Sequence, residues 1–298
     1  MNHSEHQYLN LIKRLLNHGD KRTDRTGVGT RALFGEQMRF NLADGFPLFT
    51  TKRVPWKTAF KEMLWMLSGD TNIRPLLEQD VHIWSEWPHR SYVVQTGDDI
   101  AIAEFERLVL TDGDFAKKWG DLGPVYGKQW RRWRTAEGDE IDQVQTVIDQ
   151  LKHNPAGRRI LWDGWNVGEL HQMALPPCHK HYQFFVDFKR GTLDGALVQR
   201  SADAFLGLPF NIANLALVTT LLAEQTGYQP GEIVWFGLDT HLYENHIKQA
   251  QQLVTREPRA VPNLAIQRKP ASLFDYTIND FDMQRYEPHP AIKAPVAV

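Results

Sequence analysis

The chain has 298 residues, of which 42% are hydrophobic, and its formal net charge is -2. A chain of this length and composition can bury a sizeable core in one large domain or two, and the small net charge gives no general attraction to nucleic acid or to a membrane. No apolar run approaches the roughly 20 residues of a transmembrane helix, and the first residues lack the apolar core of a signal peptide. One cysteine and no export signal favour a reduced, cytosolic setting.

The spacing of apolar residues predicts helices and strands in mixed order. In chain order we expect a helix at 7–18, a loop at 24–30, helices at 57–67 and 141–151, strands at 160–162 and 182–186, a helix at 211–226, a strand at 233–236, a helix at 244–254 and a strand at 274–281. Residues 89–118 are more polar and are predicted to form an inserted surface segment, partly helical around 103–110. Strands and helices do not alternate regularly, which favours the α+β fold class.

The lone cysteine, Cys178, is the strongest sign of chemistry in this chain. Pro176 and Pro177 precede it and His179 follows it. An unpaired cysteine is commonly just a small buried apolar residue, but the rigid approach through two prolines suits a side chain that must be aimed. A thiolate nucleophile needs positive charge or a helix start nearby. Cys178 is therefore our candidate nucleophile, provided that a cation lies beside it.

Several arginines in otherwise apolar or glycine-rich surroundings are candidate phosphate ligands. Arg25 lies in a glycine-flanked loop, Arg158 and Arg159 directly precede a predicted strand, and Arg200 lies between Gln199 and Ser201. The guanidinium fork matches two phosphate oxygens at once. Most single arginines are solvated or ion-paired, and we keep that interpretation for residues 131–134.

Four polar residues could contact a nucleotide or move a proton. Strand alternation places His241 and Tyr243 on one face, where they could hold a sugar hydroxyl or make a structural hydrogen bond. The amide of Asn211 offers the donor and acceptor that a uracil edge requires, although helix capping is its simpler role. Glu62 lies on an apolar helix face, where burial raises the pKa of a carboxylate and suits proton shuttling.

Taken together, these segments resemble the folate-dependent thymidylate synthase family. The matching runs are residues 24–30, 46–52, 69–73, 120–127, 173–179, 199–213, 239–243 and 288–298. Any one run would be weak evidence, but so many in the same order make chance negligible. The resemblance covers nearly the whole chain apart from about 89–118, where family members vary in length.

The resemblance implies a fold, a reaction and partners. It implies one catalytic domain over residues 1–298 with a variable insert at about 89–118, built on a large mixed sheet with helices packed on one side. The other sheet face would form a homodimer whose active site is shared between subunits. The implied reaction is the reductive methylation of dUMP to dTMP, with 5,10-methylenetetrahydrofolate as carbon donor and reductant. It implies neither a metal, a membrane nor a nucleic acid for catalysis.

The resemblance also assigns nucleotide-binding roles. Arg25, Arg200 and Ser201 would hold the phosphate of dUMP, and Arg158 with Arg159 would reach the phosphate bound by the partner subunit.

Other residues would line the rest of the nucleotide pocket. His241 and Tyr243 would bind the 3′-hydroxyl, with Ala202 and Leu242 beside the nucleotide, and Asn211 would distinguish uracil from cytosine.

Catalytic and folate-binding roles follow in the same way. Cys178 would attack C6 of the uracil, and Glu62 would organise a proton relay supported by Tyr126 and His179. Asp203 would contact both the nucleotide and the folate ring. Trp84 would form a wall beside the folate, and Ala297 in the tail would help to close over it.

Five positions depart from the pattern that is usual in the family. Leu238 stands where glycine is common, Val198 and Leu215 where tyrosines are common, Trp162 in a segment that is usually smaller, and Pro55 near a position that is sometimes histidine. We expect these changes to cluster around the nucleotide pocket, where they bear on substrate and product.

Three other functions compete with this interpretation. A dUMP hydroxymethylase would share the early steps, with water in place of hydride at the end. A cysteine hydrolase would pair Cys178 with His179, but adjacent side chains diverge and rarely form a dyad. A nucleic-acid-binding module would use residues 128–134, but the net charge of -2 and the absence of a long basic stripe argue against it.

Overall fold

The computed structural model describes residues 4–23 and 27–296. Arg25 and Ala297 therefore lie outside the described residues. The chain divides into two compact units: the first comprises Met1–Phe60, Ile148–Leu161 and Cys178–Val298, and the second comprises Lys61–Val147 and Trp162–Pro177. The expectation of one catalytic domain stays a prediction.

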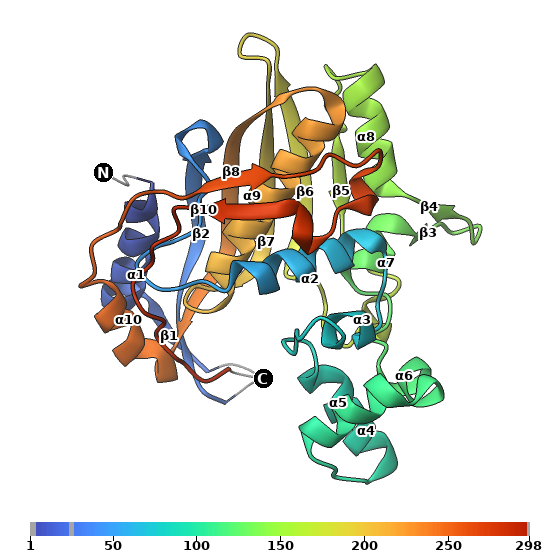
Figure 1. The fold of residues 1–298 in the computed structure, drawn as a ribbon. Helices are drawn as coiled ribbons and strands as arrows, with labels where there is room; N and C mark the ends of the chain where they lie inside the picture. Colours follow the sequence, from blue (N-terminus) through green and yellow to red (C-terminus); the bar gives the residue numbers. More distant parts are fainter. Residues whose placement is uncertain (1–3, 24–26, 297–298) are drawn as a thin grey trace. The chain divides into compact units, whose positions relative to one another are not determined.

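A six-stranded mixed sheet is the framework of the first unit (Figure 1). Its order is β1-β2-β8-β7-β6-β5, with β7 and β8 parallel and the pairs β1/β2, β2/β8 and β6/β7 antiparallel. Together with the helices, this mixed sheet confirms the predicted α+β class. The bounds are β1 (Asp20–Arg22), β2 (Thr30–Asn41), β5 (Leu161–Asp163, which starts at the end of a first-unit segment), β6 (His179–Asp187), β7 (Thr192–Asp203) and β8 (Gln229–Tyr243).

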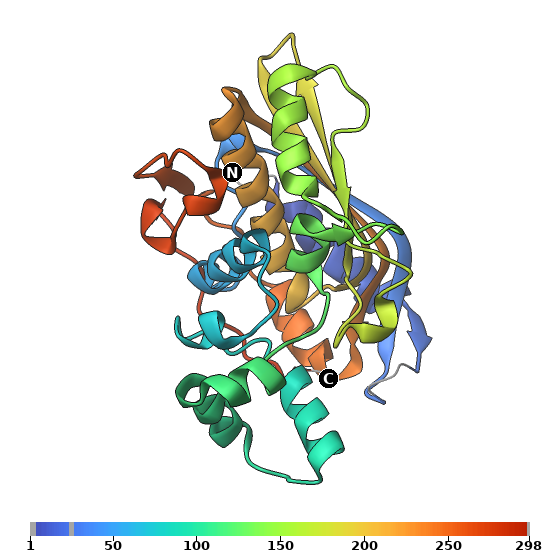
Figure 2. The same cartoon turned by 90° about the vertical axis from the view of Figure 1, so that its right-hand side faces the viewer.

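Helix α9 (Gly207–Thr226) lies against β7 and β8 and covers one face of this sheet (Figures 1 and 2). In β7 the buried side chains Leu193 and Leu197 alternate with more exposed neighbours, as a strand with one covered face requires. A Cβ on Gly195 would lie 2.1 Å from Thr219 Oγ1, so glycine permits the close approach of helix and strand.

Helix α9 is long and apolar enough, at 20 residues, to span a membrane by composition alone. The sequence-based statement that no apolar run approaches this length is therefore too strong. In the structure 72% of its 18-residue apolar window is buried inside the protein. The helix is a core element, and its all-round apolar surface reflects burial on every side.

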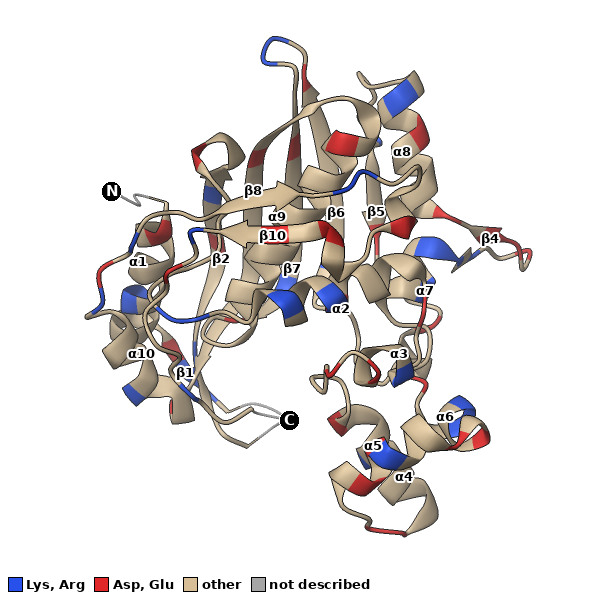
Figure 3. Ribbon diagram, viewed as in Figure 1, with Lys and Arg blue, Asp and Glu red and all other residues tan. Residues whose placement is uncertain are grey.

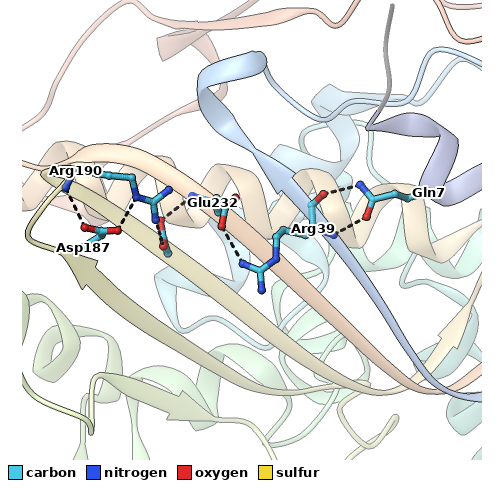
Figure 4. A network of polar contacts seen from close by, with 6 residues as sticks. Gln7, Arg39, Asp187, Arg190 and Glu232 are labelled. Carbon is cyan, nitrogen blue, oxygen red and sulfur yellow. Dashed lines mark hydrogen bonds and ion pairs between the residues drawn. The ribbon is translucent and has the colours of Figure 1, made fainter.

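The opposite face of the sheet carries exposed aromatic side chains. Phe185 on β6 is 65% exposed and Phe236 on β8 is 37% exposed. A polar network borders this surface (Figure 4). Arg39 pairs with Glu232 at 2.9 Å, and its backbone N–H donates to Gln7 Oε1 at 2.9 Å. Arg190 bridges Asp187 and Asp194. The apolar face is thus framed by charge pairs rather than covered by a helix.

The remaining elements of the first unit flank the sheet. Most predicted helices are confirmed with shifted ends. The bounds are α1 (Glu5–His18), η1 (Leu42–Asp44), η3 (Glu244–His246), α10 (Ile247–Leu253), β9 (Asn263–Ile266) and β10 (Phe281–Gln284), while α2 (Trp56–Ser68) and α8 (Gln143–His153) each run across the division between the units.

The predicted strand at 274–281 is wrong. Two short 3-10 helices, η4 (Leu273–Asp275) and η5 (Ile278–Asp280), occupy most of it, and β10 starts only at Phe281. The Asp280 carboxylate accepts from the Thr277 backbone N–H at 2.7 Å and from both arms of Arg268 at 2.7 Å. Arg268 and these hydrogen bonds lower the pKa of Asp280 to about 2. Such local capping competes with extended pairing.

The second unit is mostly helical. Its elements are α3 (Arg74–Leu77), α4 (Glu86–Thr96), α5 (Ile102–Thr111), α6 (Gly113–Trp119), α7 (Tyr126–Arg131), β3 (Trp133–Arg134), β4 (Glu140–Ile141) and η2 (Leu170–Gln172). The insert is more ordered than a partly helical surface segment. Tyr92 contacts Phe105, Phe115 and Trp119 with ring centroids 5.1–5.8 Å apart, so three helices share a small aromatic core.

The basic residues 128–134 are used within the second unit. Lys128 pairs with Glu140, Arg131 pairs with Asp142 at 2.8 Å, and Arg132 donates to the Gly69 carbonyl. Figure 3 shows basic and acidic residues side by side on this part of the chain. These local ion pairs support the structural interpretation of residues 131–134 over a nucleic-acid-binding one.

Glu5 anchors helix α1 to the loop that follows η1. Its side chain is almost fully buried and accepts hydrogen bonds from the backbone N–H groups of Thr50 (2.9 Å) and Thr51 (2.8 Å) and from both hydroxyls at 2.7 Å. Hydrogen bonds to a buried carboxylate are among the stronger ones, because the alternative is an unsatisfied charge.

We expect Glu5→Gln to lower the free energy of unfolding by about 3 kcal/mol, because the amide NH2 would face donors that now point at a carboxylate. Urea denaturation followed by circular dichroism measures this change. Glu257→Gln, at an exposed position, is the matched control and should change stability little. Equal midpoints for the two variants would show that the Glu5 cluster does not stabilise the fold.

Candidate active site

Cys178 lies immediately before β6, where the neighbouring strand fixes its position. The backbone N–H of Arg200 donates to the Cys178 carbonyl at 2.9 Å, and Arg200 Nη2 lies 4.0 Å from Cys178 Sγ. The thiol is only partly buried. A guanidinium at this distance stabilises the thiolate relative to the thiol. The structure thus supplies the cation that the sequence analysis required for a nucleophile.

His179 is directed into the core and not toward solvent. It is 4% exposed, and its Nδ1 lies 3.0 Å from Tyr182 Oη. Burial lowers the pKa of His179 to about 4, and a hydrogen bond with Asn211 only partly opposes this shift. The imidazole is therefore neutral at physiological pH. This placement supports the argument against a Cys178–His179 hydrolase pair.

A buried chain of side chains fixes the amide of Asn211. Trp235 Nε1 donates to Gln199 Oε1 at 2.8 Å, and Gln199 Nε2 donates to Asn211 Oδ1 at 2.9 Å and to the Ser201 carbonyl at 3.0 Å. Because an indole N–H can only donate, it determines which end of Gln199 is the oxygen. The amide nitrogen of Gln199 then faces Asn211, so Asn211 must present its oxygen to Gln199. The Asn211 amide is thus held in one orientation.

The capping interpretation of Asn211 is wrong. Helix α9 starts at Gly207, so Asn211 is the fifth helical residue. Sequence analysis assigned no role to Gln199 or Trp235. The available signal was a polar residue, Gln199, at a position that continues the buried alternation of Leu193 and Leu197.

Asp203 closes β7 and organises the turn into α9. Its Oδ1 accepts from the backbone N–H groups of Phe205 at 2.8 Å and Leu206 at 3.1 Å. Lys52, a residue that sequence analysis missed, donates to the Phe205 carbonyl and lies 3.9 Å from the centre of its ring. Burial lowers the pKa of Lys52 to about 8, and the negative charge of Asp203 opposes the shift. The turn is thus fixed from two sides.

His241 and Tyr243 share one face of β8, as predicted. Their ring centroids are 5.2 Å apart, and Leu242 between them is completely buried. Asp239 Oδ1 lies 3.2 Å from His241 Nδ1, and the His241 contact is the main reason that the pKa of Asp239 is lowered. The ring of His241 is therefore held by a carboxylate at one nitrogen.

Strand pairing brings these residues together. Ser201 pairs with Asp239 and Asp203 pairs with His241 across the parallel strands. Ala202, a predicted nucleotide contact, is completely buried. Two other predicted ligands of the first unit, Arg158 and Arg159, are exposed in the loop before β5.

The second unit brings three predicted residues together. Trp84 Nε1 donates to Glu62 Oε1 at 2.9 Å, and the Trp84 and Tyr126 rings pack edge to face at 5.9 Å. Trp65 and Trp87, which sequence analysis did not assign, contact Trp84 at 6.0 and 5.2 Å. Glu62 is half-buried and not fully buried as its apolar helix face suggested. Its carboxylate is oriented by the indole.

The family departures do not all lie at a ligand surface. Leu215 and Trp162 are completely buried core residues, and Trp162 packs on Trp130 at 5.7 Å. Val198 and Leu238 are half-buried on the strands, and Pro55 is exposed. Leu215 and Trp162 thus contribute to packing, which corrects the expectation that all five changes cluster around the pocket.

A partly buried thiol beside a guanidinium, on a mixed sheet covered by a helix on one face, is an arrangement that suits an enzyme with a cysteine nucleophile. Comparison with known proteins agrees. The thymidylate synthase family profile matches residues 6–298. The chain belongs to the thymidylate synthase family, so the resemblance seen in its sequence is confirmed.

Similar proteins extend over the full length of the chain. Thymidylate synthase of Zymomonas mobilis is 55% identical over 296 residues, which cover 99% of this chain and 100% of that protein. Thymidylate synthase of Rhodopseudomonas palustris is 54% identical over 299 residues, covering 100% of both chains. That of Rhizobium rhizogenes is 53% identical and covers 99% of both.

The buried, neutral His179 predicts a pH dependence of stability. The unfolded chain takes up a proton at this histidine below pH 6.5, whereas the folded chain resists protonation until about pH 4. The free energy of unfolding should therefore fall as the pH falls through this window, by up to about 3 kcal/mol from this group. Urea denaturation at several pH values should show a shallower slope for His179→Gln. His153→Gln, at an exposed position, is the control, and equal slopes for both variants would contradict the assignment.

Proposed function

We propose that this protein catalyses the reductive methylation of dUMP to dTMP, with 5,10-methylenetetrahydrofolate as donor of both the carbon and the hydride and dihydrofolate as second product. The observation that carries the proposal is the pairing of Cys178 Sγ with Arg200 at 4.0 Å in a chain that matches the thymidylate synthase family over residues 6–298. The hydroxymethylase alternative is not favoured, because the full-length relatives are named thymidylate synthase.

Cys178 starts the reaction. The thiolate forms a bond to C6 of the uracil, and the electron pair of the C5–C6 double bond moves toward C4 and O4 as an enolate. C5 thereby becomes a carbon nucleophile that attacks the methylene carbon of the folate. A fixed amide dipole stabilises the charge that develops on O4, and the orientation of Asn211 by Gln199 suits this task.

The later steps balance the atoms. C5 loses its proton to the relay that we assign to Glu62, Tyr126 and His179, and tetrahydrofolate leaves to give an exocyclic methylene. Hydride from the tetrahydrofolate converts the methylene to a methyl group, dihydrofolate forms, and the thiolate is expelled from C6. Water in place of hydride would give a hydroxymethyl group, so exclusion of water decides the product.

Ligand-binding roles complete the proposal. Arg25, Arg200 and Ser201 hold the phosphate, and His241 with Tyr243 binds the 3′-hydroxyl.

The folate and the rest of the nucleotide are held by other groups. Trp84, Asp203 and Ala297 contact the folate, and Ala202 and Leu242 shape the nucleotide pocket. The reaction needs no metal, and its setting is the reduced cytoplasm, where Cys178 stays a thiol.

We further propose that the enzyme is a homodimer through the exposed sheet face. A hollow of about 430 Å³ on the first unit is lined by Arg158 together with the aromatic residues Phe185 and Phe188. Apolar area of this kind on a sheet face suits a partner with the same surface. Arg158 then lies at the interface, and with Arg159 it reaches the phosphate held by the partner subunit.

Mass analysis of the product tests the proposed reaction. Purified enzyme with dUMP and 5,10-methylenetetrahydrofolate should give dTMP and an equal amount of dihydrofolate, followed by its absorbance. Cys178→Ala should abolish turnover and retain dUMP binding, because the phosphate ligands remain. Hydroxymethyl product with tetrahydrofolate, or a folded Cys178→Ala variant that no longer binds dUMP, would contradict the proposal.

The base-reading role of Asn211 has its own test. Asn211→Asp replaces a donor by an acceptor and should shift preference from dUMP toward dCMP, with about a tenfold or larger change in the ratio of kcat/KM values, because an unmatched polar group at a base edge costs one or more hydrogen bonds. Competition between the two nucleotides measures the ratio. An unchanged preference would remove Asn211 as the base-reading residue.

A further inference from the structure

His246 makes a hydrogen bond that joins the core to the C-terminal tail. It ends η3, directly after β8, and its side chain is completely buried. Its Nε2 lies 2.7 Å from the carbonyl oxygen of Pro295. A histidine so deeply buried would ordinarily serve the core, yet this one reaches a residue close to the end of the chain.

The chemistry of the two partners fixes the proton. A carbonyl oxygen can only accept, so Nε2 must carry the hydrogen, and in the neutral ring Nδ1 is then an acceptor. Nδ1 is buried and has no hydrogen-bond partner among the residues that the structure describes. Buried polar atoms left in this state are uncommon. The tail contact is therefore the one hydrogen bond of this ring within residues 4–23 and 27–296.

Ring packing connects His246 to two parts of the candidate site. Its ring lies 5.5 Å from that of Phe205, in the turn that Asp203 organises, and 5.5 Å from that of Tyr243 on β8. A shift of the imidazole would therefore disturb the Asp203 turn and the Tyr243 ring together. His246 thus lies between the tail, the Asp203 turn and strand β8.

Within the described residues, the other hydrogen bonds that anchor the tail lie before residue 291. Arg256 Nη1 donates to the carbonyls of Thr51 at 2.8 Å and Pro290 at 2.7 Å, and the backbone N–H of His289 donates to Thr50 at 2.7 Å. From 291 to 296, the described chain shows one hydrogen bond, the one from His246. The final described segment thus depends on this histidine for its position.

We infer that His246 is a positioning residue for the tail, which holds Pro295 beside the Asp203 turn and Tyr243 and so lets the tail exclude water during hydride transfer. The inference rests on the proposed function, because exclusion of water matters only if a hydride competes with water for the methylene intermediate. His246 itself touches neither substrate nor folate in this proposal. Its effect passes through the tail.

Two substitutions separate the hydrogen bond from the general packing of the ring. The amide nitrogen of Gln can reach the position of Nε2, whereas that of Asn reaches only the position of Nδ1. His246→Gln should therefore keep the donor to Pro295, and His246→Asn should lose it. We expect His246→Asn to speed tryptic cleavage after Lys293 about fivefold, because releasing the tail then costs one net hydrogen bond less, and His246→Gln to stay close to the wild type; mass analysis of the released peptide 294–298 measures the rate.

Turnover provides the second measurement. With dUMP tritiated at C5, tritium release reports formation of the methylene intermediate, and dihydrofolate reports hydride transfer. The wild type should give equal amounts, and His246→Asn should release about fivefold more tritium than dihydrofolate, with His246→Gln restoring the ratio. A fall of both signals in proportion in His246→Asn, or an unchanged rate of cleavage after its Lys293, would overturn the inference.

Truncation of the tail is the control for a variant that simply folds poorly. In a chain that lacks residues 295–298 the acceptor is gone, so adding His246→Asn should change the tritium-to-dihydrofolate ratio no further. Independent, multiplying effects of truncation and substitution would overturn the inference. Tryptic cleavage needs no turnover, so a protein that fails to methylate dUMP would refute the proposed function while the cleavage rate still tested the contact of His246.

Discussion

The register of β7 against its two neighbours is the constraint on which the first unit's site depends. Antiparallel pairing with β6 sets Arg200 beside Cys178, with the backbone bond at 2.9 Å and the guanidinium 4.0 Å from the sulfur. Parallel pairing with β8 sets Asp203 opposite His241. A one-residue slip would turn Arg200 to the other face of the sheet and remove the cation from the thiol. Packing of α9 over the strands stabilises this register, so the chemistry relies on the core.

Buried polar groups fix the side-chain geometry of the same region. Trp235, Gln199 and Asn211 form a chain in which each acceptor has a defined donor. Such a chain in a low-dielectric interior is favourable only while every member is satisfied. Loss of the Trp235 indole N–H would therefore leave Gln199 free to turn and, through Gln199, disturb the orientation of Asn211. The cost of an unsatisfied amide makes the orientation of Asn211 rigid, as its proposed role in reading a base edge requires.

Sequence patterns predicted what depends on local periodicity and strong motifs. The helix at 211–226, the shared face of His241 and Tyr243 and the isolated Cys178 are visible without a structure, because each follows from spacing or from an unusual run. The strand at 274–281 was wrong because Asp280 and Arg268 favour local capping. Lys52 and Gln199 acquire their roles only through partners more than ten residues away. The helices of the insert are stabilised by aromatic contacts between helices, and the residue spacing within one helix does not reveal such contacts.

Cys178 has a charged side chain on its solvent side and neutral side chains on its core side, and burial explains this difference. Arg200 lies where the thiol is only partly buried, so its charge remains partly solvated. On the core side, burial holds His179 neutral with a pKa of about 4, beside the uncharged amides of Asn211 and Gln199. A cation there would carry a desolvation cost and compete for the Asn211 oxygen. The core side therefore suits an uncharged pyrimidine edge, while the solvated side suits a thiolate and an anionic phosphate. In the proposed reaction, this one gradient of burial would orient the nucleotide before any bond is made.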